Sequence, residues 1–146
     1  MCDRMKAARD AISDDDFMLM ARTDAFAKEG LERTIERAEK YIEAGANALF
    51  PEAITSLKDY KALSEKISVP ILANITEFGM TPLFSKTELK NAGVSIILHP
   101  LSAFRAMSKA ALEVYSSISQ DGSVEKILEK MQSRDELYEI LDYHTY

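Results

Sequence analysis

The chain has 146 residues, of which 47% are hydrophobic and 29% are charged, and its formal net charge of −6 comes with an isoelectric point near 5.0. This acidic balance argues against nucleic acid as a partner, and the absence of an apolar run of roughly 18 residues argues against a membrane span. The single cysteine, Cys2, excludes an intramolecular disulfide framework and a zinc cluster, and it favours a cytoplasmic location.

The first half of the chain predicts two strands, each followed by a helix. A helix over residues 3–11 and an acidic turn precede the apolar run at residues 17–21. A long helix follows, which Gly45 at the C′ position should end, and its apolar residues have helical spacing: Leu31, Ile35, Ala38 and Ile42. A second apolar run, residues 48–50, leads into a helix that Ser56 can cap.

The second half repeats this pattern twice and then changes. A mostly apolar run at residues 71–75 and an apolar run at residues 95–98 are separated by a short helix with the capping box Ser85-x-x-Glu88. The longest helix comes next and ends at Asp121-Gly122, and two short helices close the chain. We therefore expect a single partial domain, with four βα units in residues 1–122 and a C-terminal helical appendix in residues 123–146.

Each of the four apolar runs ends in polar or charged residues. Runs without polar alternation are typical of strands that are buried on both faces of a parallel sheet. Right-handed crossovers bring the carboxyl ends of such strands to one rim, where α/β folds bind their ligands. The residues at this predicted rim are Arg22, Asp24, Glu52, Asn74, Thr76, Glu77 and His99.

The chemistry of these rim residues favours a carboxylate ligand. A guanidinium can bind a carboxylate through two parallel hydrogen bonds, and an amide and a hydroxyl can add neutral ones. The nearby acids could steer a divalent cation. No lysine ends a strand, which disfavours a Schiff-base aldolase, and neither a G-x-S-x-G elbow nor a P-loop occurs. The alternative interpretation is a set of structural ion pairs, with His99 packed at a strand end.

Four motifs carry a resemblance to a known family. They are Met20-Ala-Arg22-Thr-Asp24-Ala25, Leu49-Phe-Pro-Glu52-Ala53, Leu72-Ala-Asn74-Ile-Thr76-Glu77-Phe-Gly79 and Pro100-Leu-Ser-Ala-Phe-Arg105-Ala-Met107. In this order they strongly resemble the 2-methylisocitrate lyases, which belong to the isocitrate lyase and phosphoenolpyruvate mutase superfamily. The resemblance runs essentially from Asp3 to Tyr146.

The resemblance implies a fold, an activity and a cofactor. It implies a TIM-like (β/α)8 barrel that cleaves the small tricarboxylate 2-methylisocitrate to pyruvate and succinate in propionate breakdown, with Mg²⁺, as a cytoplasmic homo-oligomer in the full-length family. Such a barrel needs about 250 residues, so this chain resembles its C-terminal half. By position, the resemblance implies substrate contacts for Arg22, Glu52, Asn74, Ile75, Thr76, Arg105 and Arg134.

The same resemblance implies that the chain is inactive alone. In the family, the Mg²⁺-binding aspartates and a catalytic cysteine within a Lys-Lys-Cys-Gly-His stretch lie in the first half of the barrel, and this sequence contains neither. We therefore assign no catalytic residue and no direct metal ligand here, and Glu52 would reach the metal only through water. The alternatives are another superfamily reaction, such as oxaloacetate or phosphonopyruvate chemistry, and an inactive remnant or assembly module.

Overall fold

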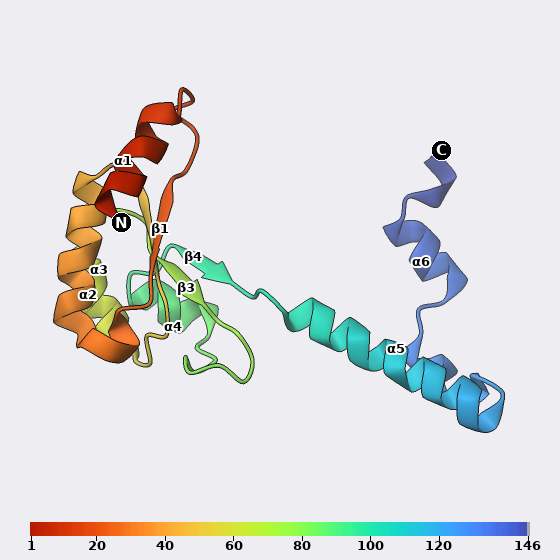
Figure 1. Ribbon diagram of the computed structural model, residues 1–146. Coiled ribbons are helices and arrows are strands. Elements are labelled where there is room, and N and C mark those ends of the chain that lie inside the picture. The colour runs from red at the N-terminus through yellow and green to blue at the C-terminus, as the bar shows by residue number, and fades with distance from the viewer. Residues whose placement is uncertain (146) are drawn as a thin grey trace. The chain divides into compact units, whose positions relative to one another are not determined.

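The computed structural model describes residues 1–145, in which helices alternate with short strands (Figure 1). The chain divides into two compact units, which we call the strand unit, Met1–Leu101, and the helical unit, which begins at Ser102. The strand unit contains α1 (Cys2–Ala11), β1 (Met20–Thr23), α2 (Phe26–Glu43), β2 (Ala48–Pro51), α3 (Leu57–Ser64), β3 (Leu72–Asn74), α4 (Lys86–Asn91) and β4 (Ile96–Leu98).

The four strands are parallel and follow one another in the order of the sequence. Strand β1 pairs with β2 from Met20–Ala48 to Thr23–Pro51, and β3 pairs with β4 in the same direction. A parallel bridge between Leu49 and Ile71 joins the two pairs. Because every connection contains a helix, this arrangement confirms the predicted α/β class and its parallel pairing.

The hydrophobic core lies between the strands and the helices. Helix α2 contacts β1 and β2, and it also contacts α3, which in turn contacts α4 (Figure 1). On β1, Ala21 and Thr23 are buried, whereas Arg22 between them is exposed, as the alternation of side chains along a strand requires. The largest fully buried side chains of the core are those of Tyr60, Leu49, Ile54, Leu63, Ile71, Ile75 and Leu89.

Serine side chains cap three of the helices, including the two that the sequence analysis identified at Ser56 and Ser85. The Ser56 hydroxyl accepts a hydrogen bond from the Asp59 amide at 3.1 Å, and the capping boxes that begin at Ser85 and Ser133 are complete. Helix α2 ends at Glu43, and Gly45 follows at the C′ position with a φ of +107°, in the left-handed region that a residue with a Cβ seldom adopts.

The first strand begins later than its apolar run indicated. Its ladder starts at Met20, so Arg22 and Thr23 belong to the strand rather than following it. Asn47 holds the residue before the ladder: its side-chain oxygen accepts a hydrogen bond from the Leu19 amide at 2.6 Å, and its backbone N–H donates to the Leu19 carbonyl at 3.0 Å. The side chain of Asn47 thus takes the place of one ladder acceptor before β1.

The helical unit contains α5 (Ser102–Asp121), η1 (Glu125–Lys130), α6 (Arg134–Ile140) and η2 (Tyr143–Thr145). The helix that we expected around residues 124–131 is of the 3₁₀ type. The two compact units divide before α5, and the predicted limits of the half-barrel and of the appendix from residue 123 stay a prediction. Within the helical unit, Lys130 forms an ion pair with Glu113 of α5 at 2.9 Å and Ser117 donates to the Ser123 carbonyl.

None of the helices in the described residues is both long and apolar enough to cross a membrane.

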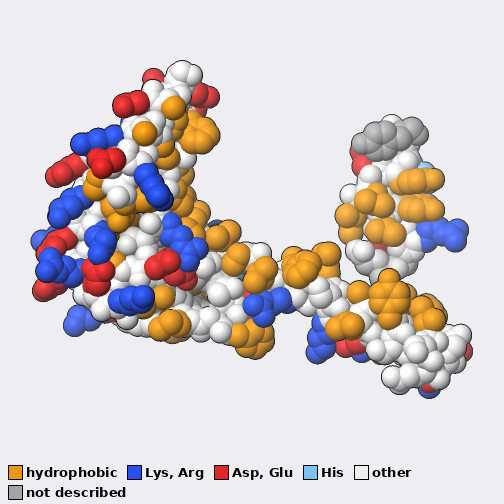
Figure 2. Space-filling view, viewed as in Figure 1, with side chains coloured by type: hydrophobic (Ala, Val, Ile, Leu, Met, Phe, Trp, Pro, Cys, Tyr) orange, Lys and Arg blue, Asp and Glu red, His pale blue; other side chains and the backbone are white. Residues whose placement is uncertain are grey.

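The surface of the described residues exposes large hydrophobic side chains between the charged ones (Figure 2). Within residues 1–145, β1 pairs only with β2 and β4 only with β3, so each outer strand has an open edge. Phe17 and Met18, just before β1, are 55% and 48% exposed. An open edge beside apolar side chains is a template for pairing with another chain.

We predict that the purified chain associates in solution instead of remaining a 16.4 kDa monomer. Two copies could pair edge to edge, because a two-fold axis along the strands keeps every strand parallel and joins the β4 edge of one copy to the β1 edge of the other. Light scattering over a range of concentrations measures the mass. A strictly monomeric chain would contradict the prediction.

Two lysine variants locate the association. Met18→Lys places a charge beside the β1 edge and should lower the average mass, because charges protect edge strands. Leu83→Lys places the same charge on the exposed loop after β3 and serves as the matched control, for which we expect the mass of the unmodified chain.

Candidate functional site

Three of the predicted site residues come together at the carboxyl ends of β1, β2 and β3. Arg22 lies in β1, Glu52 follows β2 directly, and Asn74 is the last residue of β3. The Glu52 Oε2 atom lies 3.2 Å from Arg22 Nη2 and accepts a hydrogen bond from Asn74 Nδ2 at 3.3 Å. Parallel pairing brings these strand ends together, and the Glu52 carboxylate then joins the guanidinium to the amide.

The Arg22 guanidinium has three partners. Its Nε donates to Asp24 Oδ1 at 2.9 Å, its Nη2 faces Glu52, and its central carbon lies 4.9 Å from the centroid of the Phe50 ring. The hydrogen bond to Asp24 is the main cause that raises the pKa of Arg22. Burial is the next largest effect and lowers this pKa, and the charges of Glu52 and Asp24 add smaller increases. The Arg22 side chain is nevertheless 53% exposed, so a ligand can reach it.

The backbone around the site is fixed by Thr23. The Thr23 carbonyl accepts a hydrogen bond from the Glu52 amide at 2.9 Å, and its buried hydroxyl accepts one from the Ala25 amide at 3.3 Å. These bonds tie the end of β1 both to the residue after β2 and to the start of α2. The side chains of Arg22 and Glu52 therefore project from backbone that is held in place.

Two non-glycine residues with left-handed backbone flank the site. Ala53, directly after Glu52, has a φ of +61°, and Phe78, in the loop after β3, has a φ of +63°. This region disfavours residues with a Cβ, so each costs about 1 kcal/mol or more. Strained backbone of this kind is common at ligand sites, and here it occurs after two of the strands whose ends carry the polar cluster.

Asn74 has one polar atom without a partner. Its Oδ1 is buried and accepts no hydrogen bond from any described residue. The orientation of the amide is well supported, because the opposite one would place an acceptor oxygen against the Glu52 carboxylate. A buried acceptor without a donor costs about 1–3 kcal/mol, so a water or ligand donor at this position would stabilise the site.

The described residues do not fit a directly coordinated magnesium ion. Nowhere in residues 1–145 do three or more histidine, cysteine, aspartate or glutamate side chains gather in a way that could hold a metal. Mg²⁺ prefers six oxygen ligands, and the cluster offers the Glu52 carboxylate and the Asn74 amide oxygen, beside a positively charged guanidinium. These groups suit hydrogen bonds to metal-bound water better than direct coordination.

The remaining predicted residues are placed less directly. Ile75 points into the core and its amide donates to the Leu98 carbonyl at 2.8 Å, which leaves its own carbonyl for any ligand contact. Thr76 is half-buried in the loop after β3, and His99 is exposed after β4. Arg105 and Arg134 belong to α5 and α6 of the helical unit, so their contacts with a ligand at Arg22 stay a prediction.

Two side chains near the site were not identified from the sequence. Phe50 pairs in register with Arg22 on the neighbouring strand, and this register was the signal that could have revealed the stacking. Tyr60 of α3 is 1% exposed, and its burial, together with the Glu52 charge, raises its pKa to about 12. The helical spacing of apolar residues placed Tyr60 on the buried face of its helix, but it did not indicate that Glu52 lies nearby.

Comparisons with known proteins identify the family. The family model for phosphoenolpyruvate phosphomutase matches residues 1–119. The 2-methylisocitrate lyase of Escherichia coli (strain K12) is 56% identical over 146 residues, which cover 100% of this chain and 49% of that protein. The chain thus spans about half the length of the curated relatives it matches.

Solved structures agree with this result. A 2,3-dimethylmalate lyase, a member of the PEP mutase/isocitrate lyase superfamily, has a TM-score of 0.82 at 30% identity, covering 99% of this chain and 52% of that chain. A phosphonopyruvate hydrolase in complex with oxalate and Mg²⁺ has a TM-score of 0.79 at 25% identity, with the same coverage. The similarity therefore extends over both units of the chain.

The Tyr60 pKa predicts a loss of stability at high pH. The unfolded chain releases this proton near the usual tyrosine pKa of about 10, whereas the folded chain holds it to about 12. The stabilisation is therefore complete below pH 10 and is lost as the pH rises to about 12. Denaturant titrations of Tyr60→Phe should give a free energy of unfolding that falls less steeply over this interval.

The exposed Tyr115 supplies the control for this measurement. Tyr115→Phe should keep the full alkaline loss of the unmodified chain. Identical pH dependence of Tyr60→Phe and the unmodified chain would show that Tyr60 does not cause it.

Proposed function

This chain belongs to the phosphoenolpyruvate phosphomutase family, and from that membership we propose that it forms the substrate-binding half of a carbon–carbon lyase. The proposed reaction cleaves 2-methylisocitrate to pyruvate and succinate in propionate breakdown. The 56% identity to a 2-methylisocitrate lyase over the whole chain supports this choice of reaction. The proposed setting is a cytoplasmic homo-oligomer, as the family resemblance implies.

The observation that carries the proposal is the cluster of Arg22, Glu52 and Asn74. A half-exposed guanidinium at the ends of parallel strands suits a carboxylate ligand, which it can bind with two hydrogen bonds. Its ion pairs keep the cation in place before a ligand arrives, and such preorganisation favours binding. Two further arginines, Arg105 and Arg134, would match the remaining carboxylates of a tricarboxylate, and Ile75 and Thr76 would add backbone and hydroxyl contacts.

We further propose that the four strands are half of a (β/α)8 barrel. Parallel strands in sequence order, with helices against one face, are the repeating unit of that fold. The curated relatives are about twice as long as this chain, which suits a barrel with twice as many strands. Both outer strands have open edges in the described residues, where the other half would pair.

Mg²⁺ is the proposed cofactor. Its support is the relative that was solved with oxalate and Mg²⁺, together with the family resemblance. Since the described residues do not fit a direct metal site, the ligands of the ion would have to come from outside this chain. When bound, the metal would neutralise negative charge that develops on the substrate, and Glu52 would contact only its water.

A different superfamily reaction is the second candidate. The similarity to a phosphonopyruvate hydrolase favours a smaller substrate, and oxaloacetate chemistry belongs to the same alternative. Three arginines are more cationic contacts than such a substrate needs, which favours the tricarboxylate. Relative turnover of the competing substrates decides between the two.

A chimera tests the function. We propose joining this chain to the unmatched half of the Escherichia coli relative and measuring pyruvate release from 2-methylisocitrate with Mg²⁺, beside isocitrate and oxaloacetate. We expect activity from the chimera, with 2-methylisocitrate preferred, and none from the chain alone. A folded chimera without any turnover would support an inactive remnant, and a preference for oxaloacetate would support the second candidate.

In the same chimera, Arg22→Lys should lower kcat/KM roughly ten- to a hundredfold, because a point charge cannot replace the two parallel hydrogen bonds of the guanidinium. Steady-state kinetics measures the effect. Arg33→Lys, on the outer side of α2 where Arg33 pairs with Glu36, is the matched control and should leave kcat/KM unchanged. Equal kinetics for both variants would remove Arg22 from the site.

A further inference from the structure

Two carboxylates contact the Arg22 guanidinium, and Asp24 takes its Nε hydrogen. Asp24 binds Nε at 2.9 Å and Glu52 faces Nη2 at 3.2 Å, and these two nitrogens form the side-on fork of an arginine. Among residues 1–145, no hydrogen bond or ion pair reaches Nη1. A ligand carboxylate that binds Arg22 with two parallel bonds must therefore use the end-on edge, Nη1 and Nη2.

Two further features orient this edge, although the side chains of Arg22 and Asp24 are 53% and 67% exposed. The Phe50 ring supports the guanidinium from one side, with 4.9 Å between its centroid and the central carbon. Asp24 stands between Thr23 and Ala25, which are both buried and joined by the 3.3 Å hydrogen bond to the Thr23 hydroxyl. Residues two apart along an extended chain project to the same side, so Asp24 reaches Nε from backbone that is anchored on both sides of it.

We propose that Asp24 is a positioning residue, which holds Arg22 by Nε and thereby presents the Nη1–Nη2 edge to the carboxylate of the ligand. The inference rests on the proposed function in one respect, namely that the ligand carries a carboxylate. Asp24 itself repels such a ligand, because both are negative. Its contribution can therefore come only through Arg22.

This opposition of charge makes the proposal sharply testable. If Asp24 were only a neighbouring charge, Asp24→Ala would remove a repulsion and strengthen the binding of an anion. If Asp24 positions Arg22, the same change weakens binding, because the guanidinium loses its anchor. Asp24→Asn separates the two effects further, since the amide oxygen can still accept the Nε hydrogen while the negative charge is gone.

The experiment uses the ¹⁵N-labelled chain titrated with oxalate and followed by NMR, with backbone amide spectra as the check of folding. The Arg22 Nε–H signal is assigned by its loss in Arg22→Lys. We expect a slowly exchanging Nε–H in the unmodified chain and in Asp24→Asn, and rapid exchange in Asp24→Ala. We expect oxalate affinity to fall roughly three- to tenfold in Asp24→Ala and to be kept or increased in Asp24→Asn.

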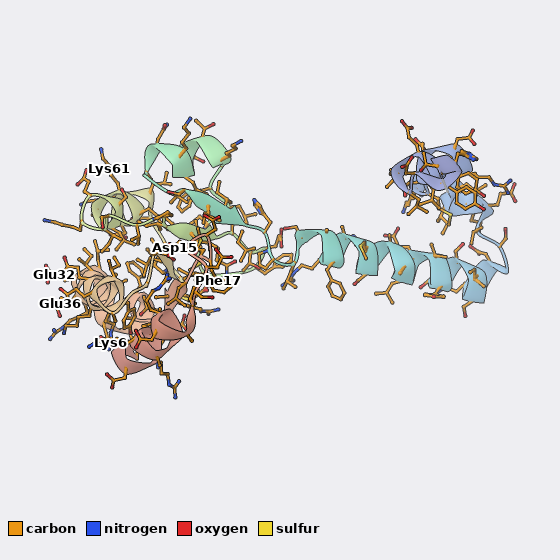
Figure 3. The ribbon with its side chains drawn as sticks, turned by 90° about the horizontal axis from the view of Figure 1, so that it is seen from above. Lys6, Asp15, Phe17, Glu32, Glu36 and Lys61 are labelled. Carbon is orange, nitrogen blue, oxygen red and sulfur yellow. The ribbon has the colours of Figure 1, made fainter. Side chains whose placement is uncertain are left out.

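Glu36→Ala is the matched control, because Glu36 pairs with Arg33 on α2 and its side chain points away from the strands (Figure 3). It should change neither the Arg22 signal nor the affinity. Unchanged or tighter oxalate binding in Asp24→Ala, or an equally protected Nε–H, would overturn the proposal. If the unmodified chain binds no oxalate, the carboxylate function fails by itself, and the exchange of the Nε–H still decides whether Asp24 positions Arg22.

Discussion

The Glu52 carboxylate is the contact on which the geometry of the site depends. It pairs with Arg22 of β1 and accepts a hydrogen bond from Asn74 of β3, so one side chain after the middle strand joins the ends of both neighbours. The arrangement requires parallel strands with β2 between β1 and β3, because their carboxyl ends then lie side by side at one edge. The register that pairs Arg22 with Phe50 also determines what lies beneath the guanidinium.

The cluster presents one donor edge and one acceptor atom to a ligand. Asp24 and Glu52 carry two negative charges beside one guanidinium, whereas Nη1 has no hydrogen-bond or ion-pair partner within the described residues and Asn74 Oδ1 has no donor. An acceptor group of a ligand would meet Nη1, and a donor group or an ordered water would meet Asn74. The buried Asn74 oxygen without a donor fits a site that receives an ordered water or a ligand donor. Backbone strain at Ala53, next to Glu52, agrees with that interpretation.

Much of the fold could be predicted from the sequence, because local signals determine it. The capping serines, Gly45 after α2 and four apolar runs locate the helices and strands to within a few residues. The start of β1 could not be predicted, since it depends on Asn47, a side chain 28 residues from the Leu19 amide that it binds. The partners of Arg22 also divide into one that local sequence indicates and one that depends on residues far apart in the chain. Asp24, two residues away, belonged to the predicted rim, whereas the Phe50 contact depends on strand register.

The central claim is that the rim built by Arg22, Glu52 and Asn74 receives a carboxylate. The most direct test is a crystal structure of the chimera with bound oxalate. The account predicts a carboxylate oxygen about 2.7–3.2 Å from Arg22 Nη1, with Asp24 still on Nε. A ligand bound elsewhere in the protein, with Nη1 of Arg22 still unoccupied, would contradict the account.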